Sequence, residues 1–94
     1  MNLLELFGLS GKRALITGSS KGIGYALAKG LAAAGAEIVI NGRDADRLEQ
    51  AAAELTASGA VVSTAVFDVT DPAAVKAGVA KIEADIGAID ILIN

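Results

Sequence analysis

Residues 17–24 read Thr-Gly-Ser-Ser-Lys-Gly-Ile-Gly, a glycine-rich turn between a short apolar run and a segment with helical periodicity. A turn that leads from a strand into a helix leaves backbone N–H groups unpaired at the positive end of the helix dipole, which suits an anion such as pyrophosphate. Gly18 can adopt a positive φ, Gly22 lets the backbone approach the ligand, and Gly24 allows close packing of helix on strand. The spacing is not that of a Walker A loop, because no Gly-Lys-Ser/Thr follows. Three glycines alone could form a turn that binds nothing, so the flanking elements decide the interpretation.

Short β-branched runs alternate with longer alanine-rich segments from Lys12 onward, a pattern typical of βαβ units around a parallel sheet. The runs are continuously apolar, as expected for strands covered on both faces. Strands are expected over residues 13–17, 37–41, 61–67 and 89–94.

Three helices are expected between these strands. The first has an apolar stripe at Ile23, Leu27 and Leu31 and a stop at Gly35. For the second, we predict an N-cap at Asp44, a stripe at Leu48, Ala52 and Leu55, and a stop at Gly59. For the third, the prediction is a cap at Asp71, Pro72 in the first turn, a stripe at Val75, Val79, Ile82 and Ile86, and a stop at Gly87.

The order of these elements predicts a single α/β domain over residues 1–94, with residues 1–11 as an N-terminal packing segment. Right-handed crossovers give a Rossmann-type sheet of strand order 3-2-1-4, with the first two helices on one face and the third on the other. We expect the fold to be truncated after its fourth strand. That strand would then be an unpaired apolar edge, and apolar side chains of the first two strands would lack cover on the third helix's side.

The composition excludes several function classes. A net charge of −3 with scattered Lys and Arg argues against a nucleic-acid surface, and no apolar run approaches the length of a membrane span. Cysteine and histidine are both absent, so we expect no metal site built from these residues. We predict a cytoplasmic protein, because the N-terminus has no basic region and Glu5 interrupts its apolar stretch.

The motif Thr-Gly-x-x-x-Gly-Ile-Gly at residues 17–24 resembles the cofactor motif of the short-chain dehydrogenase/reductase family. Asp68-Val69 after the third strand matches a second family motif, which contacts the adenine ring, and Asn94 falls where the family begins Asn-Asn-Ala-Gly. The resemblance covers residues 9–94, and within the family the wording is similar to gluconate 5-dehydrogenases. It implies the following cofactor-binding residues: Gly18, Ser19, Ser20, Lys21, Gly22, Ile23, Gly24, Asn41, Arg43, Asp68, Val69 and Asn94.

The end of the second strand indicates which nucleotide is bound. In NAD-binding Rossmann folds an acid about 20 residues after the glycine loop bonds the ribose 2′-OH, whereas an arginine accommodates a 2′-phosphate. Family alignment places Gly42 at the acid's position, Arg43 follows it, and Lys21 supplies a second cation. We therefore predict NADP(H), although Arg43 could instead be a surface residue paired with Asp44 or Asp46.

The family's catalytic serine and Tyr-x-x-x-Lys pair lie beyond the fourth strand, so no catalytic residue is assigned. Tyr25 and Lys29 reproduce the spacing, but at the wrong place in the fold. The resemblance implies the NADP(H)-binding part of a homo-oligomeric oxidoreductase acting on a small alcohol or ketone, such as a sugar acid. The 94 residues alone are predicted to be inactive. A non-catalytic nucleotide-binding module, a scaffold half-domain and a 3-oxoacyl-carrier-protein-reductase-like enzyme remain alternatives.

Overall fold

The computed structural model describes residues 8–18 and 22–93. The predicted site residues Ser19, Ser20, Lys21 and Asn94, and most of the predicted packing segment over 1–11, lie outside the described residues. The elements alternate along the chain: β1 (Arg13–Ile16), α2 (Gly22–Ala33), β2 (Glu37–Gly42), α3 (Ala45–Ala57), β3 (Val62–Val66), α4 (Pro72–Asp85) and β4 (Ile91–Ile93).

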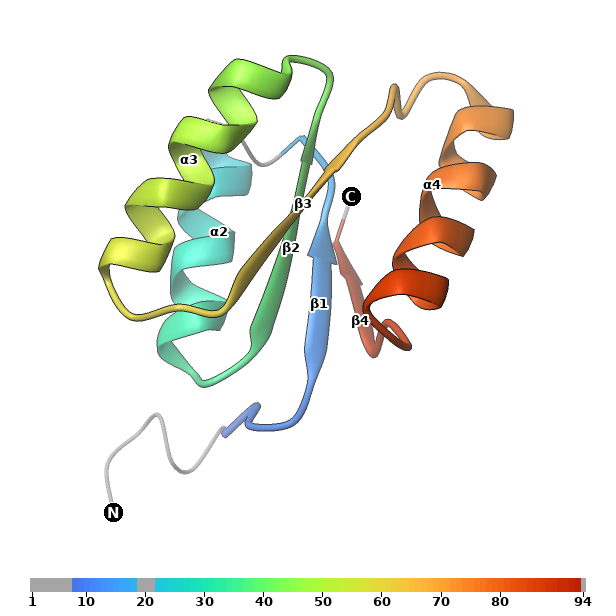
Figure 1. Cartoon of the computed structure of the whole chain (residues 1–94). Coiled ribbons are helices and arrows are strands. Elements are labelled where there is room, and N and C mark those ends of the chain that lie inside the picture. Colours follow the sequence, from blue (N-terminus) through green and yellow to red (C-terminus); the bar gives the residue numbers. More distant parts are fainter. Residues whose placement is uncertain (1–7, 19–21, 94) are drawn as a thin grey trace.

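The four strands form one parallel sheet in the order β3-β2-β1-β4, which confirms the predicted Rossmann-type topology. Figure 1 shows α2 and α3 on one face of the sheet and α4 on the other. Since all strands run the same way, their carboxyl ends meet at one edge of the sheet, where ligands bind in open α/β folds.

Strand β4 is shorter than predicted. Pairing of this segment with β1 starts at Asp90, whose N–H donates to the Arg13 carbonyl at 2.9 Å. The second hydrogen bond between these two residues involves the Asp90 side chain. Its Oδ2 accepts from the Arg13 N–H at 2.9 Å, in place of a backbone carbonyl. The regular ladder therefore begins only at Ile91.

The predicted apolar stripe of α2 is wrong at Ile23 and Leu27 and confirmed at Leu31. Ile23 is 82% exposed and Leu27 42% exposed, whereas Ala28 is fully buried. Leu31 and Ala32 pack beside Ala28 against the core. At 3.6 residues per turn, Ile23 points roughly 140° away from Ala28. The small side chain of Ala28 lets the helix lie close to the sheet, and a rule that seeks large apolar residues misses this face.

Both predicted helix caps are confirmed. Asp44 Oδ1 accepts from the N–H groups of Asp46 and Arg47, at 3.0 and 3.2 Å. Asp71 caps α4 in the same way, with Pro72 in the first turn. In α3 the buried residues are Leu48, Ala51 and Leu55, so the predicted stripe is confirmed except that Ala51 is buried more deeply than Ala52. No helix in the described part of the chain is long and apolar enough to span a bilayer.

The α4 face of the sheet is better covered than the sequence indicates. Leu15 is fully buried and Val39 is 1% exposed, so the expectation that these strands lack cover is wrong. The cover comes from Phe67, just after β3, together with Ile82 of α4. Leu92 on the edge strand β4 is less well covered and is 57% exposed.

Candidate functional site

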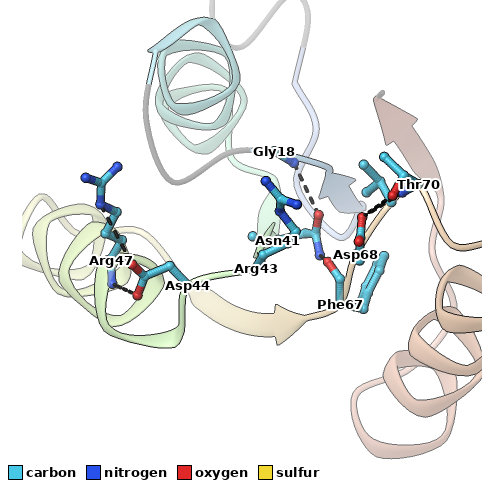
Figure 2. Close-up of a pocket in the computed structure, with 10 residues that line it drawn as sticks. Gly18, Asn41, Arg43, Asp44, Arg47, Phe67, Asp68 and Thr70 are labelled. Atoms are coloured by element: carbon cyan, nitrogen blue, oxygen red, sulfur yellow. Dashed lines mark hydrogen bonds and ion pairs between the residues drawn. The ribbon is translucent and has the colours of Figure 1, made fainter.

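A pocket of about 400 Å³ opens at the carboxyl ends of β1, β2 and β3. It is lined by Gly18, Asn41, Gly42, Arg43, Asp44, Arg47, Phe67, Asp68, Val69 and Thr70. Figure 2 shows Asn41 at its centre, between Gly18 and the segment that follows β3. The pocket thus unites three predicted motifs: the glycine loop, the end of the second strand and Asp68-Val69.

The glycine loop has the backbone that only glycine adopts readily. Gly18 has φ +61° and Gly22 has φ +65°. Among the described residues, no heavy atom would lie within 4 Å of a Cβ at either glycine, so the positive φ is what requires glycine here.

Asn41 is buried, with 1% of its surface exposed. Its Oδ1 accepts a hydrogen bond from the Gly18 N–H at 3.2 Å. Its Nδ2 donates to the carbonyls of Ala65 at 3.0 Å and Phe67 at 3.1 Å. The carboxamide of Asn41 therefore connects the loop after β1 to the end of β3.

The pocket carries two arginines, of which the sequence analysis identified one. Arg43 is exposed and makes no ion pair with any described residue. Asp44 instead faces Arg47, with 3.9 Å between Arg47 Nε and Asp44 Oδ2, and both side chains are about 60% exposed. The alternative in which Asp44 neutralises Arg43 is therefore not what the structure shows.

Arg47 was missed because it belongs to the first turn of α3, where it reads as an ordinary helix-surface residue. One signal could have identified it. A helix dipole disfavours a cation in the first turn, so an arginine there, four residues after Arg43, is unusual. Together the two guanidinium groups make this wall of the pocket suitable for a phosphate.

Asp68 lies opposite, in a tight turn with Thr70. Asp68 Oδ1 accepts from the Thr70 hydroxyl at 2.7 Å and from the Thr70 N–H at 2.9 Å. These two hydrogen bonds lower the pKa of Asp68 below its ordinary value, and the bond from the hydroxyl has the larger effect. The positive charge of Arg43 lowers this pKa further. Thr70 is a second lining residue that the sequence analysis missed, and the Asp-x-Thr spacing would have indicated it.

Val69 adds an apolar surface to the same wall, because 47% of it is exposed. An apolar side chain beside a carboxylate and backbone polar groups suits a flat heterocycle, which needs both contact area and hydrogen bonds.

Of the residues predicted to bind the cofactor, the structure brings Gly18, Asn41, Arg43, Asp68 and Val69 together in one pocket. The predicted residues Gly22, Ile23 and Gly24 begin α2, and none of them lines this pocket.

Tyr25 lies away from the pocket, and its hydroxyl donates to Glu54 Oε2 of α3 at 3.1 Å. Partial burial, this hydrogen bond and the negative charge of Glu54 raise the pKa of the tyrosine. A tyrosine held in its neutral form between two helices has the role of a packing residue.

Comparisons with known proteins agree with this geometry. The family model described as short chain dehydrogenase matches residues 12–94. The gluconate 5-dehydrogenase of Gluconobacter oxydans is 62% identical over 90 residues, which cover 96% of this chain and 35% of that protein. The chain thus spans about a third of the length of this relative.

Two solved structures are similar in both sequence and fold. A gluconate 5-dehydrogenase from Burkholderia cenocepacia, in complex with NADP and tartrate, superposes with a TM-score of 0.89 at 49% identity, covering 97% of this chain and 36% of that one. The L-sorbose reductase of Gluconobacter frateurii, complexed with NADPH and L-sorbose, gives a TM-score of 0.86 at 46% identity, covering 93% and 34%.

Proposed function

This chain belongs to the short chain dehydrogenase family, and we propose that it forms the NADP(H)-binding part of an oxidoreductase. Bound NADP(H) would supply the redox chemistry: NADPH would give a hydride to a ketone, and in the reverse direction NADP+ would accept a hydride from an alcohol. A sugar acid such as gluconate is the proposed substrate class, since similar proteins are named for gluconate and L-sorbose.

The observation that carries the proposal is the pocket wall at the end of β2. Gly42 has no side chain where an NAD-binding protein has a carboxylate, and Arg43 beside it makes no ion pair with a described residue. A 2′-phosphate at this wall would meet Arg43 and, from the first turn of α3, Arg47. A carboxylate at residue 42 would repel that phosphate, and its absence favours NADP(H) over NAD(H).

The other site residues receive roles along the dinucleotide. The pyrophosphate is assigned to the loop and helix start formed by Gly18, Ser19, Ser20, Lys21, Gly22, Ile23 and Gly24. The adenine is assigned to Asp68 and Val69, where a carboxylate and an apolar surface adjoin. Asn41 belongs to the site through its bond to Gly18, and Asn94 is assigned by family resemblance.

Nucleotide titration with matched variants tests the assignment. In one double variant, Gly42→Asp adds a carboxylate that would bond the ribose hydroxyls and repel a 2′-phosphate, and Arg43→Ala removes a guanidinium that would bind that phosphate. Because charge-assisted hydrogen bonds contribute roughly 1.5 to 3 kcal/mol, the ratio of NADP(H) to NAD(H) affinity should fall about 10- to 100-fold.

Lys76→Ala is the matched control, since it removes one positive charge from the exposed surface of α4, away from the pocket. Its ratio of affinities should equal that of the unaltered chain. An unchanged preference for NADP(H) in the double variant would overturn the assignment of this wall to the 2′-phosphate.

A further inference from the structure

We propose that Asn41 is a positioning residue, whose side chain sets the distance between the glycine loop and the Asp68-Val69 segment and so matches the pocket to a ligand that spans both. The inference rests on the proposed function in one respect, namely that the spanning ligand is a dinucleotide. The hydrogen bonds by which Asn41 holds Gly18 and the end of β3 do not depend on any ligand.

The burial of Asn41 is the first step. Among the described residues, Asn41 is the one polar residue buried with the core, at 1% exposure. Burying a carboxamide is unfavourable unless its donors and acceptor are satisfied. Both N–H donors of Asn41 reach backbone carbonyls, of Ala65 and Phe67, and its oxygen accepts from Gly18. Such a side chain is held in one orientation by its surroundings.

The position of Asn41 in the sheet is the second step. Strand β2 lies between β1 and β3, so a side chain near its carboxyl end can reach the segments that follow both neighbours. β1 ends at Ile16, and Gly18 has left the ladder with φ +61°. Its N–H is instead held by Asn41 Oδ1 at 3.2 Å. The Asn41 side chain thus forms a hydrogen bond between β2 and the segment that follows the last residue of β1.

The consequence for binding follows from preorganisation. A ligand confined to one segment gains nothing from a fixed spacing, whereas a ligand that contacts both segments avoids the entropy cost of ordering them. Loss of the Asn41 carboxamide should therefore weaken NADP+ more than adenosine 2′-monophosphate. The monophosphate has no 5′-phosphate for the glycine loop and is expected to occupy only the β2 and β3 side of the pocket, near Arg43 and Asp68.

Asn41→Leu is the principal variant, because leucine has a similar volume and no polar group. We expect the affinity for NADP+ to fall about tenfold and that for adenosine 2′-monophosphate about threefold or less. Tyr25→Phe is the control, since it removes one hydrogen bond between α2 and α3 and leaves the strand ends unchanged. An equal loss for both ligands would overturn the proposal, because it would indicate a general structural defect.

Hydrogen exchange tests the hydrogen bond between Asn41 and Gly18 without any ligand. In the unaltered chain the Gly18 amide should exchange slowly although Gly18 is an exposed residue, because Asn41 accepts its hydrogen bond. The Thr17 amide, which donates to the Ile93 carbonyl at 2.9 Å, is the internal reference. In Asn41→Leu, Gly18 should lose protection while Thr17 keeps it. A Gly18 amide that exchanges freely in the unaltered chain would overturn the proposal.

Failure of the proposed function and failure of the variant to fold can each be distinguished from failure of the Asn41 proposal. If the unaltered chain binds neither ligand, the proposed function fails, and exchange at Gly18 still decides whether Asn41 holds the loop. If Asn41→Leu does not fold, Asn41→Ser replaces it, since serine is smaller and is too short to bond both sides at once. The same unequal loss of the two ligands is expected, and an equal loss again contradicts the proposal.

Discussion

Gly78→Ala is the substitution for which the structure reverses the usual expectation. Gly78 lies within α4, where glycine is about 1 kcal/mol less favourable than alanine. Helix propensity alone therefore predicts that the alanine variant is more stable. The packing predicts the opposite, because a Cβ at residue 78 would lie 2.4 Å from Phe67 Cδ1, 2.7 Å from Cε1 and 2.9 Å from Cγ.

The magnitude follows from which atoms clash. Three ring atoms are involved, and Cγ is at the base of the ring, so a small change at the ring's tip cannot relieve the contact. The whole ring must move, yet Phe67 is 8% exposed and packs with Leu15 and Val39. Overpacking of this kind costs about 1–3 kcal/mol. After about 1 kcal/mol gained in helix propensity, a net loss of about 0–2 kcal/mol is expected.

Gly30→Ala is the matched control for the assay. Gly30 lies within α2, and a Cβ there would meet no atom within 4 Å. This variant should gain up to about 1 kcal/mol from helix propensity. Urea unfolding of the two variants should thus give free energies that differ by about 1–3 kcal/mol, which is the cost of the clash alone.

Two results would refute this reasoning. If Gly78→Ala stabilises the chain as much as Gly30→Ala does, Phe67 is free to move and does not constrain residue 78. If the loss is real but persists when Phe67→Leu is added to Gly78→Ala, then contact with the ring is not its cause. Removing ring volume should relieve part of the clash, so the two substitutions together should cost less than the sum of their separate effects.

Other predictions concern the pocket and the sheet edge. Thr70→Val removes the hydroxyl bond to Asp68, so the Asp68 pKa should rise toward its ordinary value, as an NMR titration of the carboxyl would show. Because folding lowers that pKa, the contribution of this pair to stability is present above about pH 3.9 and is lost as the pH falls through the lowered value. Arg47→Ala should weaken NADP+ binding less than Arg43→Ala, because Arg47 already faces the carboxylate of Asp44. Parallel titrations in which Arg47→Ala had the larger effect would contradict this. The 94-residue polypeptide should show no dehydrogenase turnover, because its only tyrosine is Tyr25, which is bonded to Glu54; measurable turnover by the purified species would contradict this. Leu92→Lys should reduce self-association in sedimentation experiments, since Leu92 is 57% exposed on an edge strand, and equal association would point to another surface.

The parts of the fold that could be predicted from the sequence depend on local chemistry. Asp44 and Asp71 cap helices because a carboxylate bonds the free N–H groups of the next two or three residues, which needs no knowledge of the rest of the chain. The strand order follows from short βαβ connections and their handedness. Gly18 was identifiable because the turn itself requires its positive φ, whereas the positive φ of Gly22 was not predicted.

The errors have a different origin. The buried face of α2 depends on how closely the helix approaches the sheet, and there the small Ala28 displaced the larger Ile23 and Leu27. The cover over Leu15 and Val39 comes from Phe67, which follows β3 and was predicted as part of the strand. Arg47 enters the pocket only because α3 starts beside Arg43. The contacts of Ala28 and Phe67 have no periodicity or spacing in the sequence, and Arg47 has only its unusual place in the first turn of a helix.

Phe67 connects the hydrogen bonds of Asn41 to the packing of α4 on the sheet. Its carbonyl accepts from Asn41 at 3.1 Å, while its ring packs against Gly78 and closes the core over Leu15. A ring displaced by Gly78→Ala would pull on the backbone segment that Asn41 fixes, and that segment continues directly into Asp68. Gly78 does not line the pocket, yet we expect a side chain there to alter the pocket's shape by displacing Phe67, which does line it. The glycine in α4 is therefore unfavourable for helix propensity, yet it permits the packing of Phe67, whose backbone continues into Asp68 of the pocket wall.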